Sequence, residues 1–573
     1  MPLEEEGRER QIVNLQHLGE VISTDLLIIG GGIGGIVSAI KAKEHPVDVL
    51  IVEKATAGWA GKAPKGGGIL WVLTAEDDLE KFVDYHVRVI GDFLNDQELL
   101  YAMARETLSA IEQIESWGAK IVRNEDGSLD TFRPFGPWSL AAVDLDMLNV
   151  MRKTARKRGV KIVNKVQVVD LLKQDERVVG AVGFHVISGR FYVIQAKATV
   201  LANGSCNYRV MPMWSCGRGD GIAAAYRAGA EMRNAEFGNF YNILLKGSLS
   251  PIIGADYAIC NAAGERLCER YLPGPPEPDI SIASLMGMEK EVMEGKGPVC
   301  FDPSEMHVAR LFALQFKRWK RPTANAFWRR LSEKEQRYGS DPSPRPEAIP
   351  GFIGELSPVR VDHDMRTSLN GLWAIGDTSY AGSAWAGAVP GPPGRIRGSG
   401  LMNAILSALR GGPSAARSAS ETPPPHVDPV EVKQLKESLF APMRRDKGYL
   451  PLQAVDAVRD VISPIKYSIR KSKNRLEEAL SRIGEVRVRL SELWAKDYHG
   501  LSNCNEARNM VLCAEMYFKA ALLRTESRGW HFREDYPQRD DENWLKWITM
   551  KQENGKMVFS TEALPIDRYR VKP

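Results

Sequence analysis

The stretch PPGRIRGSGL, residues 392–401, places two arginines among glycine and proline residues and then enters an apolar segment. Glycine lets the backbone come close to a ligand, and the following residues, LMNAILSALR, have helical spacing. We therefore expect a glycine-lined helix N-terminus with Arg395 and Arg397 beside it. A guanidinium is always charged and can donate two parallel hydrogen bonds to a carboxylate, so the pattern predicts binding of an anionic group.

A second glycine pattern, TDLLIIGGGIGG, lies near the N-terminus. Gly30, Gly32 and Gly35 fit G-x-G-x-x-G between an apolar strand and a helix that is expected to begin at Ile33. Glu53 follows about 20 residues later at the end of a second apolar strand, where a carboxylate can bind ribose hydroxyls. The pattern predicts a dinucleotide site with the pyrophosphate on the helix N-terminus.

The elements that must hold these residues suggest an α/β protein of several domains. Short strands follow one another from 160 to 202, and GLWAIGD, 371–377, is a further apolar strand closed by glycine and aspartate. Prolines and helical patterns mark an inserted segment. The resulting expected division is 20–245 plus 350–412 for the nucleotide domain, 246–349 for the insertion, 413–429 for a linker, and 430–573 for a helical C-terminal domain and tail.

Composition excludes several function classes. The chain has 573 residues, a hydrophobic content of 44% and a net charge of +4, which gives no support for nucleic-acid binding. No apolar run approaches the roughly 20 residues that span a bilayer, and the polar N-terminus is not a signal peptide. A cytoplasmic protein without direct membrane insertion is expected. None of the seven cysteines form a C-x-x-C pair, so neither a metal site nor an iron–sulfur cluster is predicted within this chain.

Six stretches together carry a family resemblance. They are IIGGGIGG with Glu53, TVLANGS, GRGDGIAAAYRAGAEMRNAEFGNF, NAAGERLCERY, GLWAIGD and RTESRGWHFREDYPQRDDENW. With them the sequence resembles the succinate dehydrogenase/fumarate reductase flavoprotein superfamily, which includes L-aspartate oxidase and the flavin subunit of adenylylsulfate reductase. The resemblance implies a Rossmann-like FAD-binding domain, an inserted α+β capping domain and a C-terminal helical domain.

The resemblance also implies which residues contact FAD. Asp377 would bind ribitol or pyrophosphate, and the helix start at Ser399 would face the flavin pyrimidine edge, where negative charge develops on reduction. The full set of predicted cofactor-binding residues is Gly30, Gly32, Gly35, Glu53, Lys54, Gly61, Gly67, Gly68, Ala202, Asp220, Gly376, Asp377, Ser399 and Leu401.

The flavin loop departs from the family. Many members attach FAD covalently through a histidine in S-H-T-x-A-A-Q-G-G-I, whereas the matching stretch here is AGKAPKGGGI with Gly61 at the histidine position. Non-covalent FAD is therefore predicted. Lys62 and Lys65 are additions that would stabilise anionic flavin, bind an anionic substrate, or simply be solvated loop lysines.

The family's dicarboxylate-binding set is mostly replaced. Two histidine positions align with Tyr241 and Gly354, and the proton-transferring arginine aligns with Ser284. Only the carboxylate-binding arginine remains, as Arg395. A lost general acid typically costs about 100- to 10,000-fold in rate, so fumarate or succinate turnover is not expected. Arg395 and Tyr241 are the predicted catalytic residues.

These observations predict an FAD-dependent oxidoreductase, either a reductase or a dehydrogenase. It would transfer a hydride between flavin N5 and an anionic organic substrate other than fumarate or succinate. A partner, such as an iron–sulfur electron-transfer subunit, would exchange electrons with the flavin. Oxygen or a quinone would also serve as the electron-exchange partner.

Two alternatives stay open. One is an FAD-containing electron-transfer subunit without substrate chemistry. The other is an adenylylsulfate-reductase-like enzyme, since LLKGSLSPIIGA is more similar to that branch. His363, His531 and the arginines of ESRGWHFRED are interpreted as an interdomain clamp rather than a catalytic centre.

Overall fold

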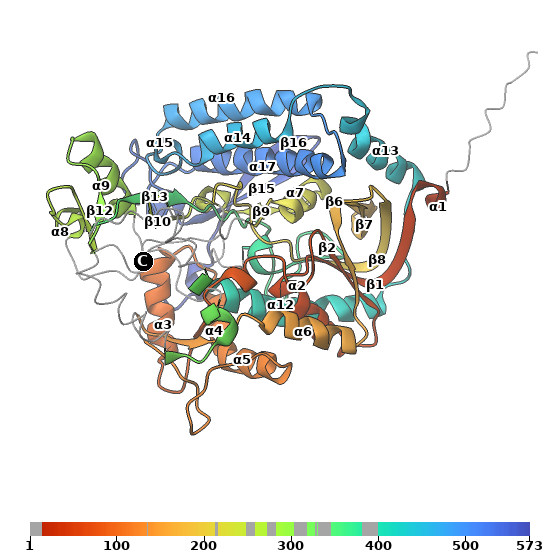
Figure 1. Cartoon of the computed structure of the whole chain (residues 1–573), viewed down its shortest axis with the longest axis horizontal. Helices are drawn as coiled ribbons and strands as arrows, with labels where there is room; N and C mark the ends of the chain where they lie inside the picture. Colours follow the sequence, from red (N-terminus) through yellow and green to blue (C-terminus); the bar gives the residue numbers. More distant parts are fainter. Residues whose placement is uncertain are drawn as a thin grey trace, which may run out of the picture.

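We describe a computed structural model of the chain. The structure describes residues 14–133, 136–211, 216–247, 258–271, 282–302, 318–326, 329–330, 345–380 and 399–573. Arg395, Arg397 and the glycines between 391 and 398 lie outside the described residues. The part of the chain that the structure describes forms a layered body around one central sheet (Figure 1).

The central sheet positions the nucleotide motif. Its strands lie in the order β5 (Lys161–Asn164), β2 (Val49–Glu53), β1 (Glu20–Ile29), β8 (Phe191–Leu201), β7 (Arg177–His185) and β6 (Val166–Gln174), and β14 (Leu372–Ala374) also pairs with β8. The pairs β5–β2, β2–β1, β1–β8 and β8–β14 are parallel. The carboxyl ends of these strands therefore meet at one edge, where ligands bind in open α/β sheets.

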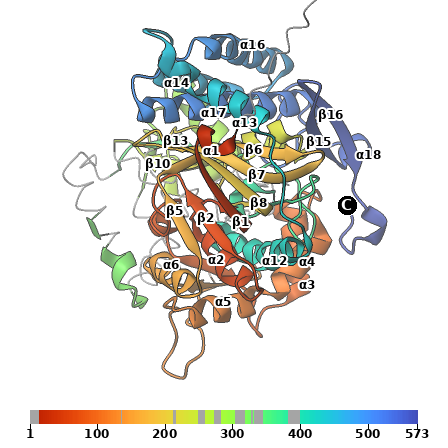
Figure 2. The ribbon, with the colours of Figure 1, turned by 90° about the vertical axis from the view of Figure 1, so that its right-hand side faces the viewer.

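Two helical layers flank this sheet. Helices α2 (Ile33–Ala42), α6 (Met147–Lys157) and α12 (Ser399–Glu421) lie on one side, and α14 (Pro451–Ile462), α16 (Lys473–Arg489) and α17 (Tyr498–Leu523) lie on the other (Figures 1 and 2). Helix α2 begins at Ile33, as predicted, and buries nearly all of its side chains because it packs on the sheet and against α12 and α6. The fold class predicted from the sequence is confirmed.

The expected linker beginning at 413 is wrong over its first half, because α12 continues to Glu421 through Pro413. A Cβ atom built on Gly412 would lie 2.6 Å from the Ser38 carbonyl oxygen, and one on Gly411 would lie 2.7 Å from an Ile375 methyl group. Gly411 and Gly412, directly before the expected linker, are thus part of the contact surface by which α12 packs closely on its neighbours. Only residues 422–428 connect α12 to α13 (Pro429–Phe440).

The insertion leaves the body through β10 (Tyr241–Leu245) and returns through β13 (Ala348–Phe352), and these strands pair antiparallel. Its described elements are β11 (Ile259–Cys260), α8 (Leu267–Tyr271), α9 (Ile282–Met293) and β12 (Cys300–Phe301), at one end of the molecule in Figure 1. The remaining principal elements are α1 (Leu15–Leu18), β3 (Ile69–Val72), α3 (Leu79–Tyr85), α4 (Gln97–Arg105), α5 (Thr107–Ser116), β4 (Ser139–Ala142), α7 (Asp220–Ala228) and α15 (Ile465–Ser468).

The C-terminal region is not purely helical. After α18 (Asp541–Trp544), strands β15 (Lys546–Glu553) and β16 (Lys556–Ala563) form a hairpin, and β15 pairs with β9 (Met232–Arg233). Asn554 and Gly555 connect the strands with φ values of 48° and 75°. An Asn-Gly pair is the strongest short-range hairpin signal in a sequence, and it could have identified this element.

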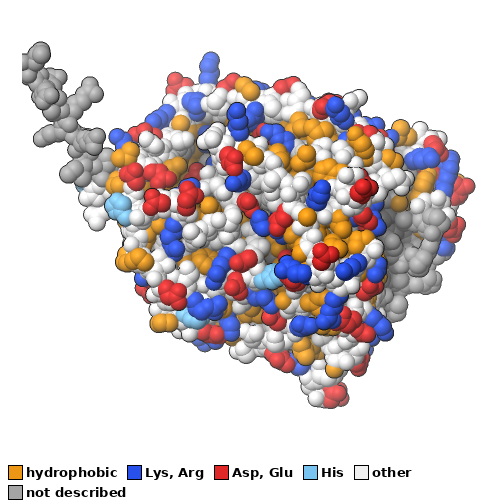
Figure 3. Space-filling model, turned by 180° about the vertical axis from the view of Figure 1, so that it is seen from behind, with side chains coloured by type: hydrophobic (Ala, Val, Ile, Leu, Met, Phe, Trp, Pro, Cys, Tyr) orange, Lys and Arg blue, Asp and Glu red, His pale blue; other side chains and the backbone are white. Residues whose placement is uncertain are grey.

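The surface shows no gathered basic area on the face drawn in Figure 3, where Lys, Arg, Asp and Glu side chains of the described residues are interspersed. This agrees with the small net charge of +4.

Candidate functional site

The glycine loop after β1 is packed too tightly for side chains at two of the three glycines of the motif, Gly30 and Gly35. Gly30 has φ = +115°, and a Cβ there would lie 2.3 Å from the Ala202 carbonyl oxygen. A Cβ on Gly35 would lie 1.9 Å from the Gly30 carbonyl oxygen. These contacts bring the first turn of α2 directly against the strand ends, which is the geometry that the motif predicts.

Gly32 is different, because a Cβ built there meets no described protein atom within 4 Å. Gly32 is the N-cap of α2, and no side chain among the described residues caps this helix end. The first N–H groups of the helix therefore face a space that the described protein leaves open, beside the positive end of the helix dipole. This site fits a pyrophosphate group.

We call the glycine loop 30–35, Glu53 and the turns after β8 and β14 the cradle. Glu53 belongs to the half of the cradle that the glycine loop forms. Its carboxylate is 8% exposed and accepts hydrogen bonds from the Gly31 N–H and the Ala55 N–H, both at 2.7 Å. The two bonds fix the carboxylate beneath the glycine loop. A carboxylate oxygen has further acceptor capacity, so Glu53 suits a ribose diol.

The other half of the cradle comes from the ends of β8 and β14. Leu201 and Ala374 are register partners, so Ala202 and Gly376 follow neighbouring strand ends. The Gly376 N–H donates to Ser407 Oγ of α12 at 2.9 Å, which ties this turn to the helix that begins at Ser399. Ser399 is buried and Leu401 is half-buried. The structure thus brings together the predicted residues of both strand ends and of α12.

Lys62 links three of these loops. Its Nζ atom lies 2.8 Å from Glu355 Oε1, 3.1 Å from Asp377 Oδ2 and 3.1 Å from Ser205 Oγ. Lys62 is therefore not a solvated loop lysine. Lys65 is exposed, and its Nζ lies 3.7 Å from Cys216 Sγ.

Lys54 and Asp220 are predicted cofactor contacts, and the structure places them in an ion pair with the C-terminal domain. Lys54 Nζ lies 2.5 Å from Asp220 Oδ2 and 2.9 Å from Glu506 Oε1 of α17. Asn509 Nδ2 also donates to Asp220 Oδ1 at 2.8 Å. Burial opposes the charge of Lys54, but the two carboxylates outweigh it and raise its pKa. Sequence reasoning could not find Glu506, because it lies 452 residues away.

The loop with Gly61, Gly67 and Gly68 lies against the cradle. A Cβ on Gly61 would lie 3.8 Å from Gly32 Cα, and Gly68 has φ = +63° with Val143 O only 2.3 Å from a built Cβ. The Gly67 carbonyl accepts a hydrogen bond from the buried Arg321, whose pKa burial lowers to about 10. These contacts place the loop next to the N-terminus of α2.

Of the positions that align with the family's substrate-binding residues, Tyr241 and Gly354 lie on paired segments. The Gly354 N–H donates to the Phe240 carbonyl at 3.0 Å, and the Tyr241 ring lies edge-on to Phe352 at 5.2 Å. The Tyr241 hydroxyl donates to the Ser463 carbonyl at 2.7 Å and also contacts Ser468 Oγ. Burial raises the pKa of Tyr241, which makes the phenol a weaker acid. These contacts favour a packing role over the catalytic one. Ser284 is buried on α9.

The motif ESRGWHFRED forms a buried ion network between the nucleotide domain and the C-terminal region. Arg524 donates to Glu236 and Glu526 at 2.8 Å each, and Arg528 donates to both oxygens of Glu526. The side chains of all four are fully buried. The structure agrees with the interpretation of this motif as an interdomain clamp.

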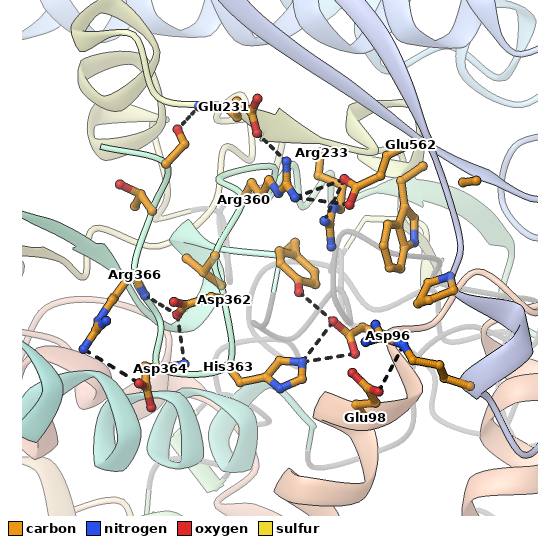
Figure 4. A pocket seen from close by; sticks show the side chains of 18 of the residues that line it. Asp96, Glu98, Glu231, Arg233, Arg360, Asp362, His363, Asp364, Arg366 and Glu562 are labelled. Atoms are coloured by element: carbon orange, nitrogen blue, oxygen red, sulfur yellow. Dashed lines mark hydrogen bonds and ion pairs between the residues drawn. The ribbon is translucent and has the colours of Figure 1, made fainter. Parts of the chain in front are cut away.

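His363 is separate from this clamp and lines a cavity of about 700 Å³ beside α4 and the C-terminal hairpin (Figure 4). His363 Nε2 lies 3.3 Å from both carboxylate oxygens of Asp96, and Glu98 lies nearby, so three atoms of the kind that ligate metals are within 4.8 Å of one another. Across the cavity, Arg233 and Arg360 pair with glutamates. The interactions drawn in Figure 4 are ion pairs and hydrogen bonds that the lining residues make among themselves.

Comparisons with known proteins agree with this geometry. Residues 25–247 match the model of an FAD-binding domain, and residues 465–573 match the fumarate reductase flavoprotein C-terminal model. The chain is 28% identical to one of the subunits of the CoM/CoB fumarate reductase of Methanothermobacter marburgensis, over 93% of this chain and 98% of that protein.

Solved structures show the same fold. A quinol fumarate reductase flavoprotein of E. coli gives a TM-score of 0.81 at 20% identity, covering 97% of this chain and 98% of that one. Adenylylsulfate reductase of Archaeoglobus fulgidus gives 0.77 at 22% identity, covering 95% and 96%.

The strand-end cradle, the open helix N-terminus and the matched FAD-binding model define an FAD-dependent oxidoreductase. The chain belongs to the succinate dehydrogenase/fumarate reductase flavoprotein superfamily. Among the described residues, no helix is both long and apolar enough to cross a membrane.

Proposed function

We propose that this protein transfers a hydride between flavin N5 and an anionic organic substrate that is neither fumarate nor succinate. The observation that carries the proposal is the replacement of three polar substrate positions by Tyr241, Ser284 and Gly354. In the structure the Tyr241 hydroxyl is engaged by the Ser463 carbonyl, and Gly354 has no side chain to offer. A dicarboxylate would lack most of the groups that bind and protonate it in the resembled family.

Under this proposal, different residues of the chain bind the cofactor and the substrate. The α2 N-terminus and Glu53 bind the pyrophosphate and a ribose, and Asp377 and the start of α12 hold the flavin half. Arg395 binds the acid group of the substrate through a bidentate contact. FAD supplies the two-electron chemistry once it is bound.

We further propose that a partner protein, with an iron–sulfur centre as the first candidate, exchanges electrons with the flavin. The Methanothermobacter relative is named as one part of a larger enzyme, and a further relative in Wolinella succinogenes is named 8-methylmenaquinol:fumarate reductase flavoprotein subunit. The scattered cysteines of this chain contain no C-x-x-C pair to hold a cluster.

The test is anaerobic stopped-flow measurement of flavin absorbance with the FAD-loaded protein. The reduced protein is mixed with fumarate and with monocarboxylic enoates such as crotonate, and the oxidised protein is mixed with adenosine monophosphate plus sulfite. We expect at least one mono-acid to react tenfold or more faster than fumarate, and Arg395→Ala to remove that difference while FAD stays bound.

Three results oppose the proposal. If fumarate reacts fastest, the protein acts on the family's usual substrate and the proposal is wrong. Flavin bleaching by adenosine monophosphate plus sulfite that exceeds the bleaching by sulfite without the nucleotide, with no reaction of any enoate, would favour the adenylylsulfate reductase alternative. Slow reaction with every compound, together with fast reduction by a ferredoxin-like protein, would favour an electron-transfer role.

A further inference from the structure

Glu355 is a buried acid next to the cofactor cradle, and the roles described above leave it unused. It is 3% exposed and follows Gly354 directly, on the segment after β13. We propose that Glu355 exchanges the substrate proton in this site and that Lys62 is the positioning residue that keeps it ionised and oriented. This inference rests on the proposed hydride transfer, because it supplies the proton that must accompany it.

The ion pair explains how an acid can remain charged in this place. Burying an isolated carboxylate is unfavourable unless a partner offsets the lost hydration. Lys62 Nζ at 2.8 Å from Glu355 Oε1 is such a partner, and the lysine side chain is itself three-quarters buried. Buried ionisable pairs in a cofactor site are candidates for function.

The position of Lys62 connects Glu355 to the flavin half of the cradle. The same Nζ atom contacts Asp377 after β14 and Ser205 after β8. Gly61, the preceding residue, lies against Gly32 at the N-terminus of α2. A group bound across these strand ends therefore borders the Lys62–Glu355 pair.

The reaction balances with these groups. In the oxidative direction the Glu355 carboxylate takes a proton from one substrate carbon, and the electrons of that C–H bond form the new C=C bond. The neighbouring carbon loses hydrogen with its bonding pair as a hydride, for which oxidised FAD is the acceptor. Glu355 then returns its proton to solvent, and reduction of the substrate follows the same steps in reverse.

A test that needs no physiological substrate is titration of the oxidised, FAD-loaded protein with sulfite, which bleaches flavin absorbance and is sensitive to nearby charge. Glu355→Gln removes a negative charge, so we expect about tenfold tighter sulfite binding at pH 8. Lys62→Met removes a positive charge, so we expect about tenfold weaker binding, and Lys62→Arg should restore it.

Matched controls separate charge from folding. Glu347→Gln breaks a more exposed Glu–Lys pair at 2.6 Å, just before β13, and Lys65→Met removes an exposed lysine from the same loop as Lys62. Both controls should bind sulfite within a factor of two of wild type, with unchanged FAD content.

Shifts in the same direction for Glu355→Gln and Lys62→Met, or no shift beyond the controls, would overturn the inference and leave a structural ion pair. Failure of the proposed function gives a different pattern, with opposite sulfite shifts but no reaction with any organic acid. Once a reacting acid is found, Glu355→Gln should lower its turnover by about 100-fold or more while the sulfite site remains intact.

Discussion

The glycine loop offers a test that separates cofactor binding from folding. Gly32 has φ = −76° and ψ = −168°, which any residue can adopt, and a Cβ there meets no described protein atom within 4 Å. We expect Gly32→Val to leave the free energy of unfolding of the apoprotein within about 1 kcal/mol of wild type, since removing a glycine slightly stabilises a compatible backbone. Gly35→Ala is the matched comparison, because its Cβ would overlap the Gly30 carbonyl oxygen at 1.9 Å.

Although Gly32→Val should leave stability almost unchanged, it should weaken FAD binding strongly. The valine side chain occupies the space that a pyrophosphate needs and blocks about two charge-assisted N–H bonds, each worth about 1.5–3 kcal/mol. The loss of about 3–6 kcal/mol corresponds to roughly 10²- to 10⁴-fold weaker FAD binding. Fluorescence titration of the apoprotein with FAD measures the affinity, and urea unfolding of the apoprotein measures the stability. Wild-type affinity in Gly32→Val, or a stability loss equal to that of Gly35→Ala, would refute the reasoning.

The remaining predictions concern other parts of the chain. Acid precipitation should release all flavin colour, since Gly61 offers no nucleophile; colour that stays in the pellet shows a covalent link. Arg395→Ala should raise KM or abolish turnover with FAD content unchanged, and an unchanged rate would place the substrate elsewhere. Asp96 raises the pKa of His363 by accepting its hydrogen bond. That pair therefore stabilises the fold fully below pH 6.5 and loses its contribution as pH rises through the raised pKa. The Tm difference between wild type and Asp96→Asn should be larger at pH 6 than at pH 9, and a constant difference contradicts the pairing. Arg524→Met should lower the free energy of unfolding, measured with denaturant, by about 3–5 kcal/mol, because it leaves buried carboxylates without their partner. Arg88→Met breaks an exposed ion pair and should lower it by under about 0.5 kcal/mol. Equal losses would show that the clamp does not stabilise the fold.

Local pattern correctly predicts the strand, turn and helix that carry the glycine motif. The strand before Gly30, the helix from Ile33 and the carboxylate of Glu53 are all where the spacing indicates. These features depend on a short stretch of backbone, since one strand, one turn and one helix fix them. Sequence alone is sufficient when the interacting residues are about 20 positions apart.

Contacts between distant segments could not be predicted in the same way. The residues that follow the Gly411–Gly412 pair indicate a linker by composition, yet α12 continues through them to Glu421, and the pair itself packs on Ser38 and Ile375. Lys54 follows the strand that ends at Glu53, and this position predicts a contact with the cofactor. Its partner Glu506 is on a helix more than 450 residues later, and nothing in the local sequence points to it.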